Sequence, residues 1–129
     1  MTITVPLTIN GEAHLNGRVI PKEEMVKAVD AWKETLKYNQ CFGHFRRPGQ
    51  DPLVTPGFSH KVETAFNSNN GESFAVIETI PTPEGEELQN VLGTLEHHDR
   101  YEFQPRGFLE NGEFSISTID VVEKRNPVN

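Results

Sequence analysis

Two segments of the chain show the hydrophobic spacing of amphipathic helices. In residues 21–38 apolar side chains recur three or four positions apart, and Pro21 suits the first helical turn. In residues 82–98 the same spacing follows Thr82, a suitable N-cap, and Pro83. The pattern predicts two helices, each with one buried stripe: Met25, Ala28, Val29, Trp32 and Leu36 in the first, and Leu88, Val91, Leu92 and Leu95 in the second.

The other apolar segments favour β-strands. β-Branched residues alternate near the N-terminus, where Pro6 favours an edge position, and a short extended piece follows between two Asn-Gly turn signals. One later segment, residues 73–80, is continuously apolar over 74–77, which predicts a central strand covered on both faces. Asn111-Gly112 predicts a turn between the last two strands. The strands are expected at residues 2–9, 58–66, 73–80, 100–104 and 113–123.

Two features of this pattern are irregular. In the last predicted strand the alternation puts Phe114 and Ile116 on one face but Ile119 and Val121 on the other, which predicts a β-bulge or burial on both faces. Residues 39–57 contain several prolines and no hydrophobic period, so we predict a long loop, a feature that is commonly functional in a compact domain.

Together the elements predict one α+β domain over residues 1–129. Its architecture is expected to be a mostly antiparallel sheet or small β-barrel flanked by two helices. A chain of 129 residues fits a single domain and needs neither a metal ion nor a disulfide to fold.

Charge and cysteine content narrow the classes of function. The formal net charge of -7 argues against a general binder of nucleic acids or anionic membranes. Cys41 is the only cysteine, which excludes an intrachain disulfide and a cysteine-based zinc site. No segment has the pattern of a signal peptide, and no apolar run approaches the roughly 20 residues that span a bilayer. We therefore expect a soluble, cytoplasmic protein.

The histidines do not predict a metal site. His97 and His98 are adjacent, so their side chains diverge, and they suit the end of the second helix. His44 and His60 are sixteen positions apart, and the spacing suggests no third ligand. We expect no metal and no cofactor.

Three other groups of side chains carry candidate chemistry. Arg46-Arg47 can bind a phosphate or a carboxylate, although a solvated pair is the simpler interpretation. We interpret Cys41 as a half-buried side chain rather than a nucleophile. His60 and Asp120, with Ser115 or Ser117, contain the residue types of a serine-hydrolase triad, but such trios are common in chains of this size.

The order of several short motifs resembles the prohead maturation (core) proteases of T4-type phages. "LNGRVIPKEEMVKAV" is similar to the opening Asn-Gly-Arg segment and helix of that family, and "FGHFRRPG" to its Gly-His-Pro loop. "FSHKVETAF" resembles its Ser-His strand, and "ETIPTPEGEELQNVL" its strand, turn and helix. "STIDVVEKRNP" resembles its closing Asp-Val-Val strand. The similarity runs from about Asn16 to Pro127.

The resemblance implies a β-barrel flanked by helices and a serine protease that cleaves scaffold and capsid proteins. His44 falls on the family's catalytic-histidine loop and Asp120 on its Asp-Val-Val strand. The chain departs from the family at the nucleophile. Where the family carries Gly-Val-Ser-Ser-Arg-Gly, this chain has "YEFQPRGF", so Gln104 and Pro105 stand in place of the serines. Gln cannot attack a carbonyl, and Pro lacks a backbone N–H.

The leading hypothesis is therefore a phage-encoded, catalytically inactive relative of the prohead protease that works by binding. The expected partner is a capsid or scaffold protein, or a host protein that is inhibited during infection, and the expected place is the infected bacterial cytoplasm or the virion. The predicted binding residues are Arg46, Arg47 and Arg106. No catalytic residue is expected, and the positions that would be remnants of a catalytic site are His44, His60 and Asp120. The alternatives are a serine protease with a relocated nucleophile and a pocket for a phosphorylated small molecule. Self-association is left open.

Overall fold

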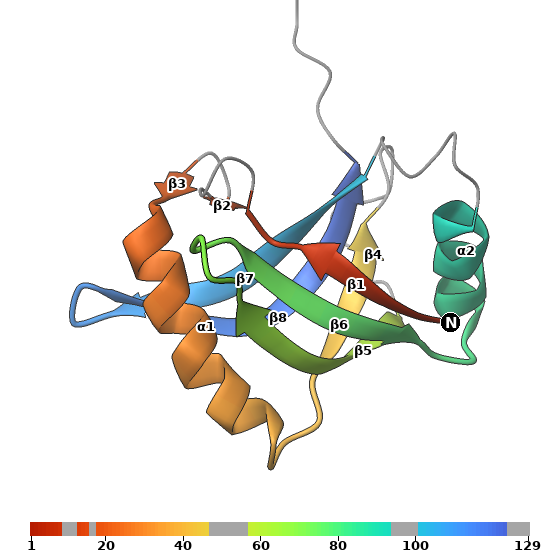
Figure 1. The fold of residues 1–129 in the computed structure, drawn as a ribbon. Helices are drawn as coiled ribbons and strands as arrows, with labels where there is room; N and C mark the ends of the chain where they lie inside the picture. Colours follow the sequence, from red (N-terminus) through yellow and green to blue (C-terminus); the bar gives the residue numbers. More distant parts are fainter. Residues whose placement is uncertain (9–12, 16–17, 47–56, 94–100, 124–129) are drawn as a thin grey trace, which may run out of the picture.

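The fold consists of eight strands and two helices within the described part of the chain. The computed structural model describes residues 1–8, 13–15, 18–46, 57–93 and 101–123. Along the chain its elements are β1 (Thr2–Pro6), β2 (Ala13–Leu15), β3 (Arg18–Ile20), α1 (Lys22–Leu36), β4 (Phe42–Arg46), β5 (Phe58–Asn67), β6 (Ser73–Thr79), α2 (Pro83–Leu92), β7 (Tyr101–Glu110) and β8 (Glu113–Glu123) (Figure 1).

Six of the strands form one mixed sheet in the order β1-β6-β5-β4-β8-β7. The pairs are antiparallel except β4 and β8, which run parallel. The prediction of an α+β fold with a mostly antiparallel sheet is confirmed. The alternative of a small barrel is wrong, because β1 and β7 are the outer strands of an open sheet rather than neighbours. Pro6 lies on the outer strand β1, as expected for a residue without an N–H.

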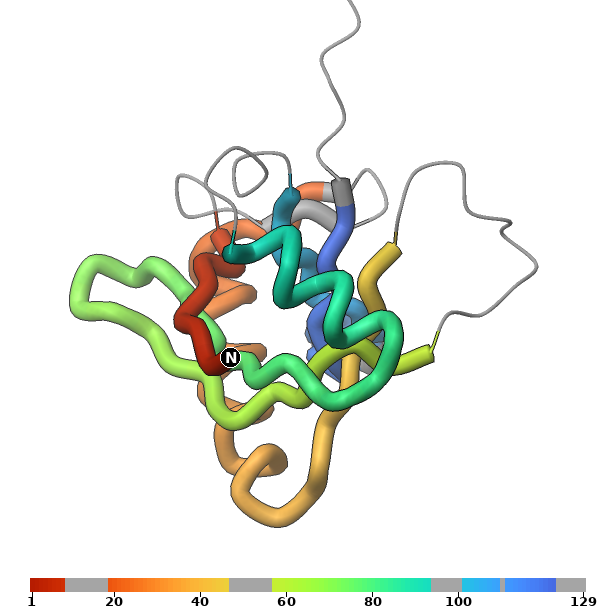
Figure 2. The backbone as a smooth tube through the Cα atoms, turned by 90° about the vertical axis from the view of Figure 1, so that its right-hand side faces the viewer, coloured from red at the N-terminus to blue at the C-terminus, as the bar shows by residue number. Residues whose placement is uncertain are grey.

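The helices lie near opposite ends of β5: the Asn67 side chain at its end donates to α1, and Thr82, the N-cap of α2, donates to the Phe58 carbonyl at its start. Helix α1 packs against β5, β6 and β8, and α2 packs against β4, β5 and β6. Figure 1 shows the two helices well apart, and the side view in Figure 2 shows α2 nearer the viewer than α1. Each helix therefore covers its own part of the sheet.

Both predicted helical stripes face the core. Met25, Ala28, Val29, Trp32, Leu88 and Leu92 are buried, and Leu36 and Val91 pack against the same cluster. The Thr82 hydroxyl accepts the backbone N–H of Gly85 at 3.0 Å, which confirms the predicted N-cap. Helix α2 ends at Leu92, and Leu95 lies outside the described residues.

The predicted loop 39–57 is wrong at residues 42–46. Residues Phe42–Arg46 form β4, which lies inside the sheet between β5 and β8. Gly43, His44 and Phe45 are all buried, so the strand shows no alternation of polar and apolar residues. A short central strand that contains Gly and His lacks the period by which a strand is recognised in a sequence. Residues 47–56 lie outside the described part.

Two other strand predictions have different outcomes. β6 lies between β1 and β5, as expected, but it is not covered on both faces, because buried Ala75 and Ile77 alternate with half-buried Val76 and exposed Glu78. The predicted bulge in the last strand is confirmed, since the β7–β8 register shifts and leaves Ser117 as an extra residue on β8.

The turn between β7 and β8 has the predicted residues. Asn111 and Gly112 both have positive φ angles, of 53° and 79°. Two consecutive positive φ values are typical of the type I′ turn that Asn-Gly favours in a hairpin. In Figure 1 this hairpin extends past α1.

Candidate functional site

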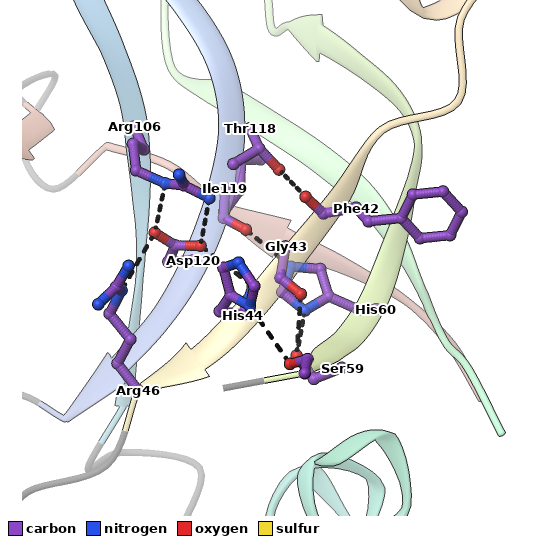
Figure 3. A network of polar contacts seen from close by, with 11 residues as sticks. Phe42, Gly43, His44, Arg46, Ser59, His60, Arg106, Thr118, Ile119 and Asp120 are labelled. Carbon is purple, nitrogen blue, oxygen red and sulfur yellow. Dashed lines mark hydrogen bonds and ion pairs between the residues drawn. The ribbon is translucent and has the colours of Figure 1, made fainter. Parts of the chain in front are cut away.

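Three adjacent strands bring the family-like positions together. His44 lies on β4, Asp120 on β8 and Gln104 on β7. Gln104 is the Cα partner of Asp120, and the backbone N–H of His44 donates to Asp120 Oδ1 at 3.1 Å although the two residues are 76 positions apart. Figure 3 shows His44 and Asp120 side by side. Residues distant in the sequence therefore form one site.

The carboxylate of Asp120 is held by arginines. Arg106 donates from Nε to Oδ2 at 2.9 Å and from Nη2 to Oδ1 at 3.4 Å. The Nε atom of Arg46 lies 3.5 Å from the same Oδ2 atom. The Asp120 side chain is 6% exposed, whereas those of Arg46 and Arg106 are 50% and 44% exposed. A buried anion thus anchors two half-exposed cations (Figure 3).

The ring of His44 is held by a different strand. Its Nδ1 atom lies 3.2 Å from the carbonyl oxygen of Gly57, and the ring stacks on Phe58 at 4.9 Å between centroids. Because a carbonyl only accepts, Nδ1 carries the proton in this contact. In a catalytic triad the carboxylate accepts from the histidine ring, but here Asp120 accepts from the His44 backbone amide. The pair therefore does not have triad geometry.

The expected nucleophile position contains no hydroxyl group. The side-chain amide of Gln104 donates to the carboxylate of Glu102. Pro105 is fully buried and has no N–H with which to stabilise an oxyanion. Neither residue can form an acyl-enzyme intermediate.

A second histidine forms a pair that the sequence did not predict. Ser59 Oγ lies 2.7 Å from His60 Nδ1, and His60 Nε2 lies 2.7 Å from the carbonyl oxygen of Ile119. The Ile119 carbonyl requires the proton on Nε2, so Nδ1 accepts the hydroxyl proton of Ser59. Ser59 and His60 are both 0% exposed. The pair has the hydrogen bond of a nucleophile and its base but no contact with solvent.

A β-bulge produces this arrangement. Gly43 and His44 on β4 pair with His60 and Phe58 on β5, so Ser59 is the extra residue. In a regular strand, neighbouring side chains point to opposite faces, and a bulge changes that direction. The adjacent Ser and His in the sequence were the only signal for the pair, because the bulge depends on the pairing of β4 with β5.

Gly43 lets the imidazole of His60 cross β4 to reach β8. A Cβ atom on Gly43 would lie 2.0 Å from the Ile119 oxygen and 2.3 Å from His60 Nε2. We call the contact between these two parallel strands the β4–β8 seam. Its Cα partners are Phe45 with Val121 and Arg46 with Val122.

Side chains add further hydrogen bonds along the seam. Thr118 Oγ1 donates to the Phe42 carbonyl at 2.7 Å, and Cys41 Sγ lies 3.2 Å from the Ser117 carbonyl (Figure 3 shows the first of these). The other two seam contacts are those of His60 and of Asp120 described above. The functional candidates are therefore also the groups that join the two parts of the sheet.

Burial shifts two pKa values at the seam. It lowers the pKa of His60, because the charged imidazolium would lose its hydration, and this outweighs the Ile119 hydrogen bond and the nearby Asp120 carboxylate. It raises the pKa of Cys41, so the thiol stays protonated and is a poor nucleophile. The interpretation of Cys41 as a half-buried side chain is confirmed.

The predicted trio of His60, Asp120 and a serine is not assembled. Both ring nitrogens of His60 are occupied by Ser59 and Ile119. Ser115 and Ser117 lie on β8, and among the described residues no hydrogen bond joins either serine to a histidine.

Several other predicted positions lie outside the described residues. These are Arg47, His97 and His98. Among the residues that are described, no group of three or more His, Cys, Asp or Glu side chains is placed to hold a metal ion.

Comparisons with other proteins add no family assignment. The chain matches no protein-family model, and neither curated proteins nor solved structures show a match to it. Within the described part, neither helix is long and apolar enough to cross a membrane.

Proposed function

We propose that this chain is a catalytically inactive, phage-encoded relative of the prohead proteases that acts by binding a protein. The proposed partner is a capsid or scaffold protein of the phage, or a host protein that the chain inhibits in the infected cell. The motif resemblance given above is the basis for the family, and the site geometry is the basis for the loss of catalysis.

One observation carries the proposal. The three positions that resemble a catalytic histidine, an acid and a nucleophile lie on adjacent strands, yet none of the bonds of a triad joins them. Asp120 binds the His44 backbone amide and two arginines instead of an imidazole. Gln104, which lies opposite Asp120, has no hydroxyl group. Positions that are together in space but have lost the nucleophile fit an enzyme fold that has been retained for binding.

A second candidate function is a serine hydrolase that uses Ser59 and His60. The 2.7 Å hydrogen bond between them is the observation in its favour. Their burial is against it, because a substrate carbonyl must come within about 3–3.5 Å of the attacking oxygen. The two candidates differ in whether Ser59 becomes accessible.

A fluorophosphonate probe and a binding assay test the proposal together. Wild-type protein should remain unlabelled, and immobilised wild-type protein should retain one capsid, scaffold or host protein from infected cells. A variant with Arg46→Glu and Arg106→Glu is the matched control and should lose that protein. Stoichiometric labelling of wild type that disappears in Ser59→Ala would instead establish the hydrolase. Equal retention by the control variant would place the binding surface away from Arg46 and Arg106, and retention of no phage or host protein by wild type would contradict the binding function.

A further inference from the structure

We propose that Arg46 and Arg106 form a clamp for a single carboxylate group of the protein partner. This proposal rests on the proposed binding function and names the chemistry that the partner must present. The clamp consists of the guanidinium groups of Arg46 on β4 and Arg106 on β7, together with the Asp120 carboxylate on β8 that both contact (Figure 3).

The anchoring of the two arginines leaves donors for a ligand. Asp120 Oδ2 is contacted by the Nε atoms of both residues, at 3.5 Å from Arg46 and 2.9 Å from Arg106. A guanidinium has five N–H donors. Within the described residues, the contacts with Asp120 use only Nε of Arg46 and Nε and Nη2 of Arg106. The other N–H groups of both arginines remain for a ligand. Because Asp120 already holds the two side chains in place, they lose less conformational entropy when a ligand binds.

The local charge matches a monoanion. The clamp itself, two guanidinium cations and one carboxylate, sums to one positive unit, and Glu102, whose Cα partner Val122 is also that of Arg46, places a further carboxylate on β7. The whole chain carries a formal charge of -7, so the clamp is a positive spot on an acidic protein. A singly charged carboxylate would add less negative charge beside Asp120 and Glu102 than a doubly charged phosphate would. The local charge therefore favours a carboxylate over a phosphorylated ligand.

The surroundings of the clamp suit a protein surface. Both arginine side chains are about half exposed, at 50% and 44%, so a ligand would be covered only if it belonged to a larger partner. Phe58 is 47% exposed and stacks on His44, which lies two positions before Arg46 on the same face of β4. Arginine beside an exposed aromatic ring is a composition enriched in protein interfaces.

Titrations of the full, isotopically labelled chain test the clamp by NMR of the arginine Nε–H signals. The probes are N-acetylglutamate α-amide, which has only a side-chain carboxylate; N-acetylphenylalanine, which has a C-terminal carboxylate beside an aromatic ring; and inorganic phosphate. Chloride is the ionic reference. The titrations are made at about 10 mM ionic strength, where the Debye length is about 30 Å.

We expect at least one carboxylate probe to shift the signals of Arg46 and Arg106 together and saturably, and more tightly than phosphate. The tighter of the two identifies an acidic side chain or a chain terminus as the source. Arg46→Gln or Arg106→Gln should weaken binding about tenfold, the equivalent of about 1.4 kcal/mol. Lys37→Gln is the matched control, since Lys37 is 53% exposed and also ion-paired, and it should change nothing.

Tighter binding of phosphate than of either carboxylate would overturn the clamp in favour of a phosphorylated ligand. Shifts no larger than those with chloride, or equal affinity in Arg46→Gln, would overturn it as well. Each of these titration results can be distinguished from a failure of the proposed function. Hydrolase labelling would refute the inactive protein without affecting the titration, whereas loss of the clamp would leave an inactive binding protein that uses another surface.

Discussion

Replacement of Gly43 by alanine tests whether the β4–β8 seam holds the sheet together. The added Cβ atom would lie 2.0 Å from the Ile119 carbonyl oxygen and 2.3 Å from His60 Nε2, where ordinary contacts begin at 3.4 Å. The carbonyl belongs to the backbone of β8 and cannot move independently. The imidazole must therefore leave its position, or β4 must move away from β8.

Either response breaks the His60–Ile119 hydrogen bond. A buried donor or acceptor without a partner costs about 1–3 kcal/mol, and forcing an extra methyl group into a packed site costs about 1–3 kcal/mol. The two costs together lower the expected free energy of unfolding of Gly43→Ala by about 2–6 kcal/mol. Since a domain of this size is stable by about 5–15 kcal/mol, the loss is large enough to measure, and folded protein remains except at the low end of that range.

Urea unfolding followed by the fluorescence of Trp32 measures the effect, because Trp32 is the only tryptophan and is buried. Gly112→Ala is the control. Gly112 has a φ of 79° and nothing within 4 Å of an added Cβ, so this variant reports backbone strain of about 1–2 kcal/mol without a clash. Equal losses in the two variants would refute the reasoning.

A double-mutant cycle separates the two clashes at Gly43. In a His60→Ala background the imidazole is absent, so Gly43→Ala meets only the Ile119 carbonyl and should cost less than it does in wild type. Strict additivity would mean that the imidazole contributes nothing to the requirement for glycine.

Three further predictions follow from burial and hydrogen bonding. Leu88→Ala should cost about 2–5 kcal/mol in urea unfolding, whereas Leu109→Ala, at a position 49% exposed, should stay within about 0.5 kcal/mol of wild type. Asp120→Ala should lower the free energy of unfolding by about 2–3 kcal/mol, because it leaves the His44 backbone amide without an acceptor. Asp120→Asn keeps an acceptor for that amide and should cost only about 1 kcal/mol, because the arginines that lose their ion pair are half exposed. Equal losses in the two variants would contradict the importance of the His44 amide. Burial lowers the pKa of His60, so on acidification the unfolded chain binds a proton at this residue before the folded chain does. The contribution of neutral His60 to stability should be complete above the ordinary pKa of about 6.5 and should decrease as the pH falls from there through the lowered pKa. The variant His60→Gln should lack this part of the pH dependence.

The sequence predicted the elements that have a regular period. Both helices, their buried stripes and the N-cap at Thr82 follow from spacing three or four residues apart and from the capping chemistry of threonine. The Asn111-Gly112 turn follows from two backbone conformations that few other residue pairs adopt. In each case the information is local, so a single sequence contains it.

The elements that escaped prediction depend on contacts between distant strands. β4 is short, contains Gly43, lies between two other strands and is buried on successive residues. The Ser59–His60 pair needs a bulge that only the pairing of β4 with β5 creates. The sequence named His60 and Asp120 as candidates but joined them in one trio, whereas the sheet gives each a separate set of partners.

The β4–β8 seam gives Asp120 and His60 a structural role. Asp120 accepts the backbone amide of His44, and His60 connects β5 to the carbonyl of Ile119 across Gly43. Each contact satisfies a buried polar group where the parallel strands have few Cα partners. The sheet therefore needs Asp120 and His60 whatever the chain's function is. Their presence is no evidence of catalysis, so evidence for function must come from groups that the sheet does not require, of which the exposed ends of Arg46 and Arg106 are the strongest candidates.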